Sequence, residues 1–156
     1  MPSYPSLSGA GPRGPAGLAS LLRLRLAAER RAEVALASTV SARGRAQQRQ
    51  EALSSSARAA RAELAARRSS EQPLPERARE ALLRERFWAR CAARATDLAQ
   101  KAEAHRRDVL APAAAAEHQA RSALVSARAQ REAVETLIAR REAAARRLRD
   151  RREEAG

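Results

Sequence analysis

Apolar side chains in the last third of the chain recur in steps of three, four or seven residues. Leucine, alanine, valine and isoleucine side chains form this series, which we call the hairpin seam: Leu124, Ala127, Val134, Ile138, Ala145 and Leu148. A spacing of three and four residues places them on one face of an α-helix, and such a face needs a partner helix to cover it. Arg131 and Arg141 fall in the same register, so we expect them to lower the stability of the seam.

The same spacing runs through the first half of the chain, from near Leu18 to about Arg68. One alanine-rich stripe consists of Ala28, Ala32, Ala35, Thr39, Ala42, Ala46, Leu53, Ala57, Ala60 and Leu64. A second, more apolar stripe consists of Leu22, Leu26, Leu36 and Val40. Together they predict a helix over about residues 17–69, with a length on the order of 75 Å.

Prolines divide the rest of the chain. Pro73 and Pro75 cannot lie inside a helix, because proline lacks an amide donor and clashes with the preceding turn, so they predict a turn over about 70–75. A helix is expected over about 76–110, with Ala81, Trp88, Ala92, Ala95, Ala99, Ala102, Arg106 and Val109 in its stripe. Pro112 predicts a kink at 111–112, after which the helix resumes over about 113–153.

A short connection between two long amphipathic helices favours antiparallel packing. We therefore predict an all-α chain with a long antiparallel two-helix coiled-coil hairpin over residues 17–156, whose second arm is kinked at Pro112. The first 16 residues are rich in proline and glycine, which predicts a disordered lead. A parallel dimeric rod is the alternative, and Pro73 and Pro75 disfavour it.

The composition supports a rod and a cytosolic location. Hydrophobic residues make up 44% of the chain but aromatic residues only 2%, so a compact core would be thin. Cys91 is the single cysteine, which excludes an intramolecular disulfide and indicates a reducing compartment. No apolar run approaches the roughly 18 residues of a membrane span, and the start lacks the pattern of a secretory signal.

The charge points to acidic partners. The net charge is +13, carried almost entirely by arginine and spread along the chain. Such a surface suits an acidic protein, an anionic membrane face or a nucleic acid. Nucleic acid is disfavoured, because no reading module or aromatic stacking platform is present and acidic residues lie among the arginines.

No constellation for catalysis is visible. The sequence has no phosphate-binding glycine loop, no nucleophile motif and no cluster of cysteine and histidine. His105 and His118 lie too far apart for one helical metal face, and Glu117 with Arg121 has the spacing of a supporting ion pair. We therefore expect a protein that is not an enzyme, with no cofactor, no metal and no small-molecule substrate.

Phe87 and Trp88 form the one aromatic site of the predicted helices. Adjacent residues point about 100° apart on a helix, so both cannot face the partner helix. Trp88 falls in the stripe and is expected to anchor the hairpin near its turn. Phe87 is then the better candidate for an exposed docking residue.

The chain resembles the central-stalk proteins of type III secretion systems, the SctO/YscO/FliJ-like family, in particular its shorter Hrp-type members. The resemblance rests on the layout of a basic hairpin of about this length and on the closing stretch REAVETLIARRE, residues 131–142, followed by an arginine- and glutamate-rich run to Glu154. Members of that family end in a similar helix with a Val-Glu-x-Leu pattern and paired basic residues. Three features depart from the family pattern: the longer lead, the interruption at Pro112 and the low apolar content of the seam.

The resemblance implies a stalk that enters the pore of a hexameric export ATPase at the cytoplasmic face of the inner membrane, stimulates it, and reaches toward the export gate and possible export chaperones. Membrane association would then come only through these partners. The implied contacts with the ATPase pore are made by arginines of the last helix: Arg140, Arg141, Arg146, Arg147 and Arg149. The implied contacts with the gate or a chaperone are made by Phe87 and Trp88.

Two other readings remain open from the residues alone. A homo-oligomeric coiled-coil scaffold predicts helicity that rises with concentration and a dimeric mass. A basic nucleic-acid-binding helical protein predicts an affinity that falls steeply with salt. The sequence does not decide which helix face binds a partner, or whether the setting is virulence, symbiosis or the flagellum.

Overall fold

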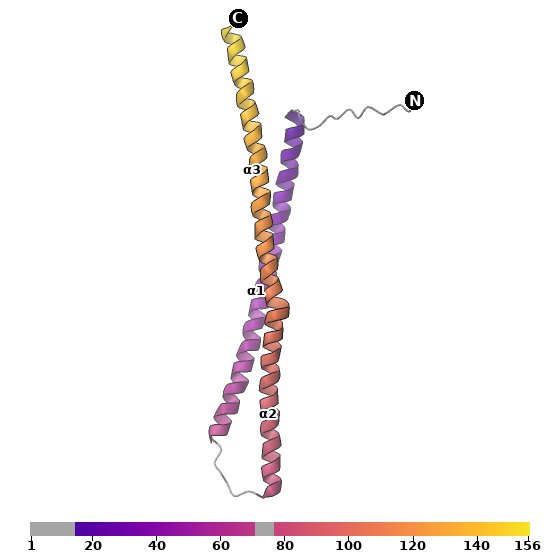
Figure 1. Cartoon of the computed structure of the whole chain (residues 1–156), viewed down its shortest axis with the longest axis vertical. Helices are drawn as coiled ribbons and strands as arrows, with labels where there is room; N and C mark the ends of the chain where they lie inside the picture. Colours follow the sequence, from indigo (N-terminus) through magenta and orange to yellow (C-terminus); the bar gives the residue numbers. More distant parts are fainter. Residues whose placement is uncertain (1–14, 71–76) are drawn as a thin grey trace, which may run out of the picture. The chain divides into compact units, whose positions relative to one another are not determined.

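The computed structural model describes residues 15–70 and 77–156. It contains helix α1 (Pro15–Ser70), helix α2 (Ala78–His105), a π-helical turn η1 (Arg106–Leu110) and helix α3 (Ala111–Glu154) (Figure 1). Within these ranges only Arg77, Ala155 and Gly156 are not helical, and no strand is present. The prediction of an all-α chain is therefore confirmed for the described residues. Most of the expected disordered lead, and most of the expected turn at 70–75, lie outside them.

The ends of the helices have local chemical causes. Proline opens α1 at Pro15, where its missing amide hydrogen costs nothing. The hydroxyls of Ser69 and Ser70 donate to the carbonyls of Ala66 and Arg67, at 2.9 and 3.0 Å, and satisfy acceptors that the helix end leaves over.

Helix α2 begins after Arg77, which has an extended backbone. The Arg77 carbonyl accepts from the amides of Glu80 and Ala81, and the Arg77 amide donates to the Glu80 carboxylate at 3.4 Å. This return contact from the third helical residue is half of a capping box, and it fixes the start of α2.

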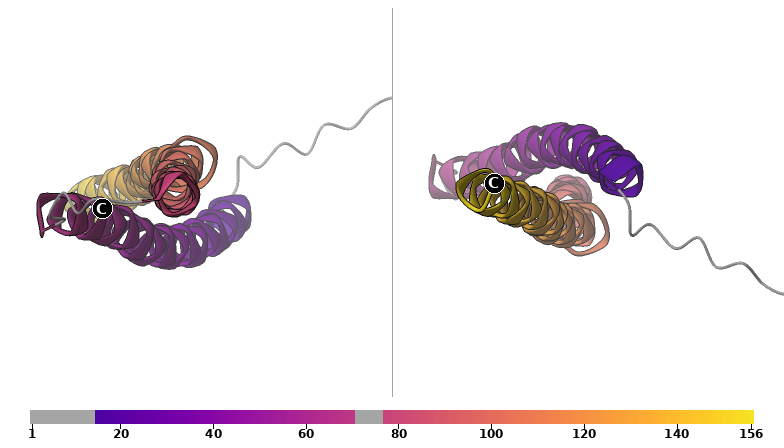
Figure 2. Two further views of the ribbon diagram at one scale, coloured as in Figure 1. Left: turned by 90° about the horizontal axis from the view of Figure 1, so that it is seen from below. Right: turned by 90° about the horizontal axis from the view of Figure 1, so that it is seen from above.

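The chain divides into two compact units, which we describe separately. Unit 1 contains residues 15–37 of α1 and residues 119–156, most of which belong to α3. Unit 2 contains residues 38–70 of α1 together with 77–118, which include α2, η1 and the start of α3. Figure 1 shows these helical segments along their length and Figure 2 shows them end-on.

The segments in each unit are antiparallel. In unit 1, Leu18 lines a groove with Ile138 and Ala145, whereas the later residue Glu29 contacts the earlier residue Arg128. In unit 2, Arg43 contacts Glu117, Gln50 contacts His105, and Leu64 faces Trp88 across a groove. The residue numbers rise along one segment as they fall along the other.

The covered side chains recur in steps of three and four. In unit 1 the covered positions of the later segment include Ala120, Leu124, Ala127, Arg131, Val134 and Ile138. In unit 2 those of α1 include Thr39, Arg43, Ala46, Gln50, Leu53, Ala57, Ala60 and Leu64. The expected stripes were wrong at several positions, since Leu26, Ala35, Val40 and Ala42 are exposed. Leu36 is covered in place of Ala35 and Arg43 in place of Ala42, and Gln50 is covered at a position that the expected stripe skipped.

The π turn changes the step of the covered face in unit 2. The series through α2 continues to Ala102 and His105, and its next covered residue is Leu110, five positions later. The expected stripe members Arg106 and Val109 are exposed instead, with 45% of Val109 accessible. The Ala111 amide bonds to the carbonyl of Arg106, five residues back, which is the pattern of a π-helix. One wider turn thus absorbs one extra residue.

Pro112 lies in the first turn of α3, directly after η1. Proline has no amide hydrogen to continue the α-helical ladder, so the π turn falls where that ladder would be interrupted in any case. The backbone at Ala111 is right-handed helical, with φ −64° and ψ −45°, and the chain stays helical through Pro112.

Candidate partner-binding surfaces

The five arginines implied as ATPase contacts all lie on α3 in unit 1 and are exposed. At 100° per residue their side chains leave the helix in directions spread around its axis, not along one face. Arg141 also lines a groove with Leu18, Ala19 and Ile138. This part of α3 therefore presents cationic groups to several sides at once.

The six residues of the hairpin seam differ in their exposure to solvent. Leu124 and Val134 are each 8% exposed, and Ala127 and Ile138 are half-buried. Ala145 is exposed although it lines the groove with Leu18, and Leu148 is 54% exposed. Burial thus declines along α3 toward its C-terminal end, where the arginines gather.

Ion pairs link the two segments of unit 1. The Glu29 carboxylate accepts from Arg128 Nε at 3.2 Å and from Arg131 Nε at 2.6 Å, and Arg128 Nη2 also reaches Glu33 at 3.2 Å. Arg131 Nη1 contacts Glu135 at 2.6 Å, and the carboxylates of Glu135 and Glu29 raise the pKa of Arg131. The expected cost of Arg131 in the seam is therefore offset by carboxylates from both segments.

Polar pairs also cross unit 2. Glu117 is only 4% exposed, and its carboxylate accepts from Arg43 Nη1 on α1 at 3.2 Å. Seven positions after Arg43 on α1 and twelve positions before Glu117 on the other segment, His105 Nδ1 lies 3.1 Å from Gln50 Oε1. The sequence pairs Glu117 with Arg121 on its own helix and gives no sign of the contact with Arg43, because a residue's partner on another helix leaves no local pattern.

Two bidentate pairs lie on the exposed side of the π turn. Arg106 contacts both oxygens of Glu103, at 2.6 and 3.1 Å, and Arg107 contacts both oxygens of Asp108, at 2.8 and 3.2 Å. These guanidinium groups hold the pKa values of Glu103 and Asp108 below their ordinary values. Both pairs are local, so they support the turn without joining the two segments.

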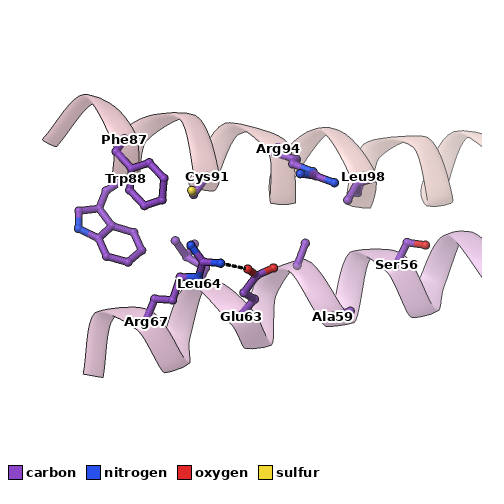
Figure 3. Close-up of a pocket in the computed structure, with 11 residues that line it drawn as sticks. Ser56, Ala59, Glu63, Leu64, Arg67, Phe87, Trp88, Cys91, Arg94 and Leu98 are labelled. Carbon is purple, nitrogen blue, oxygen red and sulfur yellow. Dashed lines mark hydrogen bonds and ion pairs between the residues drawn. The ribbon is translucent and has the colours of Figure 1, made fainter. Parts of the chain in front are cut away.

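Phe87 and Trp88 lie beside a groove in unit 2, between the end of α1 and the first half of α2 (Figure 3). Trp88 is half-buried and Phe87 is 39% exposed. Their rings meet edge to face, with centroids 5.3 Å apart, and the Arg68 guanidinium carbon lies 6.0 Å from the centre of the Trp88 ring. The groove has a volume of about 460 Å³, and its lining also includes the apolar residues Ala59, Ala60, Leu64, Cys91 and Leu98 and the polar residues Ser56, Glu63, Arg67 and Arg94.

The described residues show neither a metal-binding cluster nor a membrane-spanning helix. They contain no group of three or more histidine, cysteine, aspartate or glutamate side chains that could hold a metal ion. None of the described helices combines the length and the apolar character needed to cross a membrane. Searches of the chain against protein-family models, curated proteins and solved structures found no match.

Proposed function

We propose that the chain is a non-enzymatic stalk of a type III secretion export apparatus, a protein-transport component related to the SctO/YscO/FliJ-like family. In this proposal it works in the cytoplasm at the inner membrane, as a long two-helix coiled-coil hairpin. The steps of three and four along the covered faces of both units support a coiled coil. Small side chains at those faces, such as Ala46, Ala57, Ala95 and Ala102, let two helices approach closely and keep the rod narrow.

One observation carries the proposal: five arginines near the end of α3 are exposed and point to all sides of the helix where burial declines, namely Arg140, Arg141, Arg146, Arg147 and Arg149. A stalk inside a hexameric ring must touch several equivalent sites without locking to one of them. Exposed arginines on flexible stems make ion pairs of about 0–1 kcal/mol each, which exchange readily. Acidic loops in the pore of a hexameric ATPase would meet these arginines from every side.

Phe87 and Trp88 belong to unit 2, whereas these arginines belong to unit 1. In this proposal the groove of Phe87 and Trp88 meets the export gate or an export chaperone. The second arm bends at η1 and Pro112, between this groove and the part of α3 that carries the arginines. The bend is part of the proposal, and a wider turn followed by proline is a common cause of one.

Stimulation of the export ATPase tests the proposal. Replacing the arginines at 140, 141, 146, 147 and 149 by glutamine should abolish most of the rise in ATP hydrolysis that the unmodified chain produces with the export ATPase of the same organism. The matched control replaces five exposed arginines of unit 2 by glutamine: Arg45, Arg49, Arg61, Arg79 and Arg86.

The control makes the same change in net charge and should retain most of the stimulation. An equal loss of stimulation in both variants would show that only the total charge of the chain matters. Full stimulation by the first variant would refute the pore contact. Circular dichroism must show the same helicity for both proteins, so that unfolding is not mistaken for lost binding.

A homo-oligomeric scaffold is the second candidate function. It is favoured by exposed large apolar side chains, including Leu24 at 63%, Val34 at 71% and Val125 at 68%. A second copy could cover them. The mass in solution separates this candidate from a monomeric stalk.

A further inference from the structure

The groove beside Phe87 and Trp88 arises from a change in side-chain size along the two helices of unit 2. Ala57 and Ala95 are 6% and 3% exposed, so the helices are in close contact there. Toward the ends of the segments, Leu64 and Trp88 stand at the facing positions (Figure 3). Larger side chains hold the helices apart, and the space of about 460 Å³ between them remains unfilled.

Apolar side chains from both helices line this groove together with Ser56, Arg94 and the Glu63–Arg67 ion pair. Alanine and leucine from α1 face Phe87, Trp88, Cys91 and Leu98 from α2. Arg94 lines one side, and Arg67, paired with Glu63, lines the other (Figure 3). Next to Phe87, the side chain of Leu83 is 56% exposed and extends the apolar surface along α2.

The segments of unit 2 that form the groove carry more net positive charge than its other described residues. Residues 56–70 and 77–98, the segments that form it, contain ten arginines and four carboxylates. The other described residues of unit 2, 38–55 and 99–118, contain six basic and four acidic residues. A trough lined partly by apolar side chains, between two segments that are both net basic, is complementary to a ligand that is apolar on one face and acidic on the other.

We propose that this groove binds an acidic amphipathic helix of a partner protein. Apolar side chains at positions i, i+3 or i+4, and i+7 of that helix enter the trough, and its carboxylates meet Arg94 and the neighbouring arginines. The inference rests on the proposed function in one respect: it names the chemistry of the partner that the proposed function places at the groove of Phe87 and Trp88. Its observations are all local to unit 2.

The same features disfavour two other occupants. A second copy of this chain has a net charge of +13 and brings further arginines to a basic surface. A nucleic acid needs an open aromatic face for stacking, whereas the Trp88 ring already has the Phe87 ring at 5.3 Å and the Arg68 guanidinium at 6.0 Å.

The test uses the full chain and a synthetic helical peptide with leucines along one face and glutamates elsewhere. Trp88 is the only tryptophan and Cys91 the only cysteine, so tryptophan fluorescence and the rate of thiol alkylation both report on the groove. The acidic peptide should change the fluorescence in a saturable manner and slow alkylation of Cys91. A peptide with lysine in place of each glutamate should do neither.

Two substitutions locate the binding site. Ala60→Glu places a carboxylate in the groove and should weaken binding by at least about tenfold. Arg94→Glu should weaken it by about fivefold, whereas the control Arg45→Glu, an equal charge change on the same unit, should leave it within about twofold. Thermal unfolding followed by circular dichroism checks that each variant folds.

Three results would overturn the inference. The first is no saturable binding of the acidic peptide, or equal binding of the lysine peptide. The second is protection of Cys91 by a single-stranded oligonucleotide and not by the peptide. The third is protection that depends only on the concentration of the chain itself, which would assign the groove to a second copy. ATPase stimulation by the full chain is measured separately, so failure here and failure of the stalk proposal remain distinguishable.

Discussion

The least expected residue in the structure is Glu117, a carboxylate with only 4% exposure in a chain whose covered faces are mostly alanine and leucine. A buried carboxylate is costly to desolvate unless a cation and hydrogen bonds compensate. Arg43 supplies the cation from the opposite segment, at 3.2 Å. The pair therefore fixes which part of α1 lies against the start of α3 in unit 2, in addition to any stability that it contributes.

Replacing Arg43 alone should lower the free energy of unfolding more than replacing Arg43 and Glu117 together. Arg43→Ala leaves Glu117 without its partner on α1, so we expect the free energy of unfolding to fall by about 1–2 kcal/mol. The control Arg45→Ala removes an exposed arginine nearby and should stay within about 0.5 kcal/mol of the unmodified chain. Replacing both Arg43 and Glu117 by methionine should restore stability or raise it. Urea unfolding measures all three, and equal values for the two alanine variants would show that the contact with Arg43 contributes nothing.

The contribution of the exposed Glu103–Arg106 pair to stability can be measured through its dependence on pH. Arg106 lowers the pKa of the Glu103 carboxyl in the folded chain, so the charged form favours folding. This contribution is complete above the ordinary glutamate pKa of about 4.3 and is lost as the pH falls through the lowered value. The melting temperature of Glu103→Gln should therefore lie below that of the unmodified chain at pH 7 and coincide with it at about pH 2.

Glu85→Gln is the matched control for this experiment, because Glu85 is also exposed on α2 and its replacement makes the same change in net charge. It corrects for the general repulsion in a basic chain. If the two glutamine variants melt alike at every pH, the contact of Glu103 with Arg106 has no effect on stability.

At the scale of the elements, the sequence predicted the helices and much of one covered face. The series from Ala120 to Ile138 is covered as the spacing predicts, because apolar residues mark it. In α1 the covered face includes Arg43 and Gln50, which are satisfied by partners on α2 and α3. Apolar periodicity alone assigns the covered face to the neighbouring alanines, because alanine occurs on every face of this helix.

The π turn could not be predicted for a related reason. Val109 and Leu110 are adjacent and both apolar, and either could continue the series after His105. Only the backbone decides between them: a step of four keeps an α-helix, and a step of five needs a π turn. The structure takes the step of five next to Pro112, where an α-helical hydrogen bond is missing in any case.

This interpretation predicts that one deletion is tolerated. With Pro112→Ala as the background, deleting Val109 turns the step of five into a step of four, so a regular α-helix keeps the covered face in register. The free energy of unfolding should then stay within about 1 kcal/mol of the Pro112→Ala variant. Deleting the exposed residue Ala93 in the same background rotates the following covered positions by about 100° and should cost more than about 2 kcal/mol.

Urea unfolding and circular dichroism measure both deletions. Equal losses would mean that the π turn is not an accommodation of one extra residue. A lower helix content in the Val109 deletion than in the Pro112→Ala variant would also contradict the interpretation, because it predicts an uninterrupted helix.

For the whole molecule, the open question is whether the exposed apolar residues are used to make a dimer. Leu24 and Val34 are ten residues apart on α1, and the exposed Arg31 lies between them on the helix surface, so they do not form one continuous apolar face. Apolar residues scattered in this way are ordinary on a monomer, whereas a dimer needs a contiguous patch. The net charge of +13 also disfavours close approach of two copies, although at physiological salt it acts only within about 8 Å.

We therefore expect light scattering to give a mass near 16.9 kDa over a wide range of protein concentrations. Raising the salt concentration screens the repulsion between copies, so a monomer at high salt shows that apolar attraction is weak as well. A stable mass of twice this value would indicate that the exposed leucines and valines lie in a dimer interface. It would favour the scaffold over the stalk. A monomer would leave those side chains, and the groove beside Trp88, available to a partner of different composition, which a stalk that links an ATPase to other components requires.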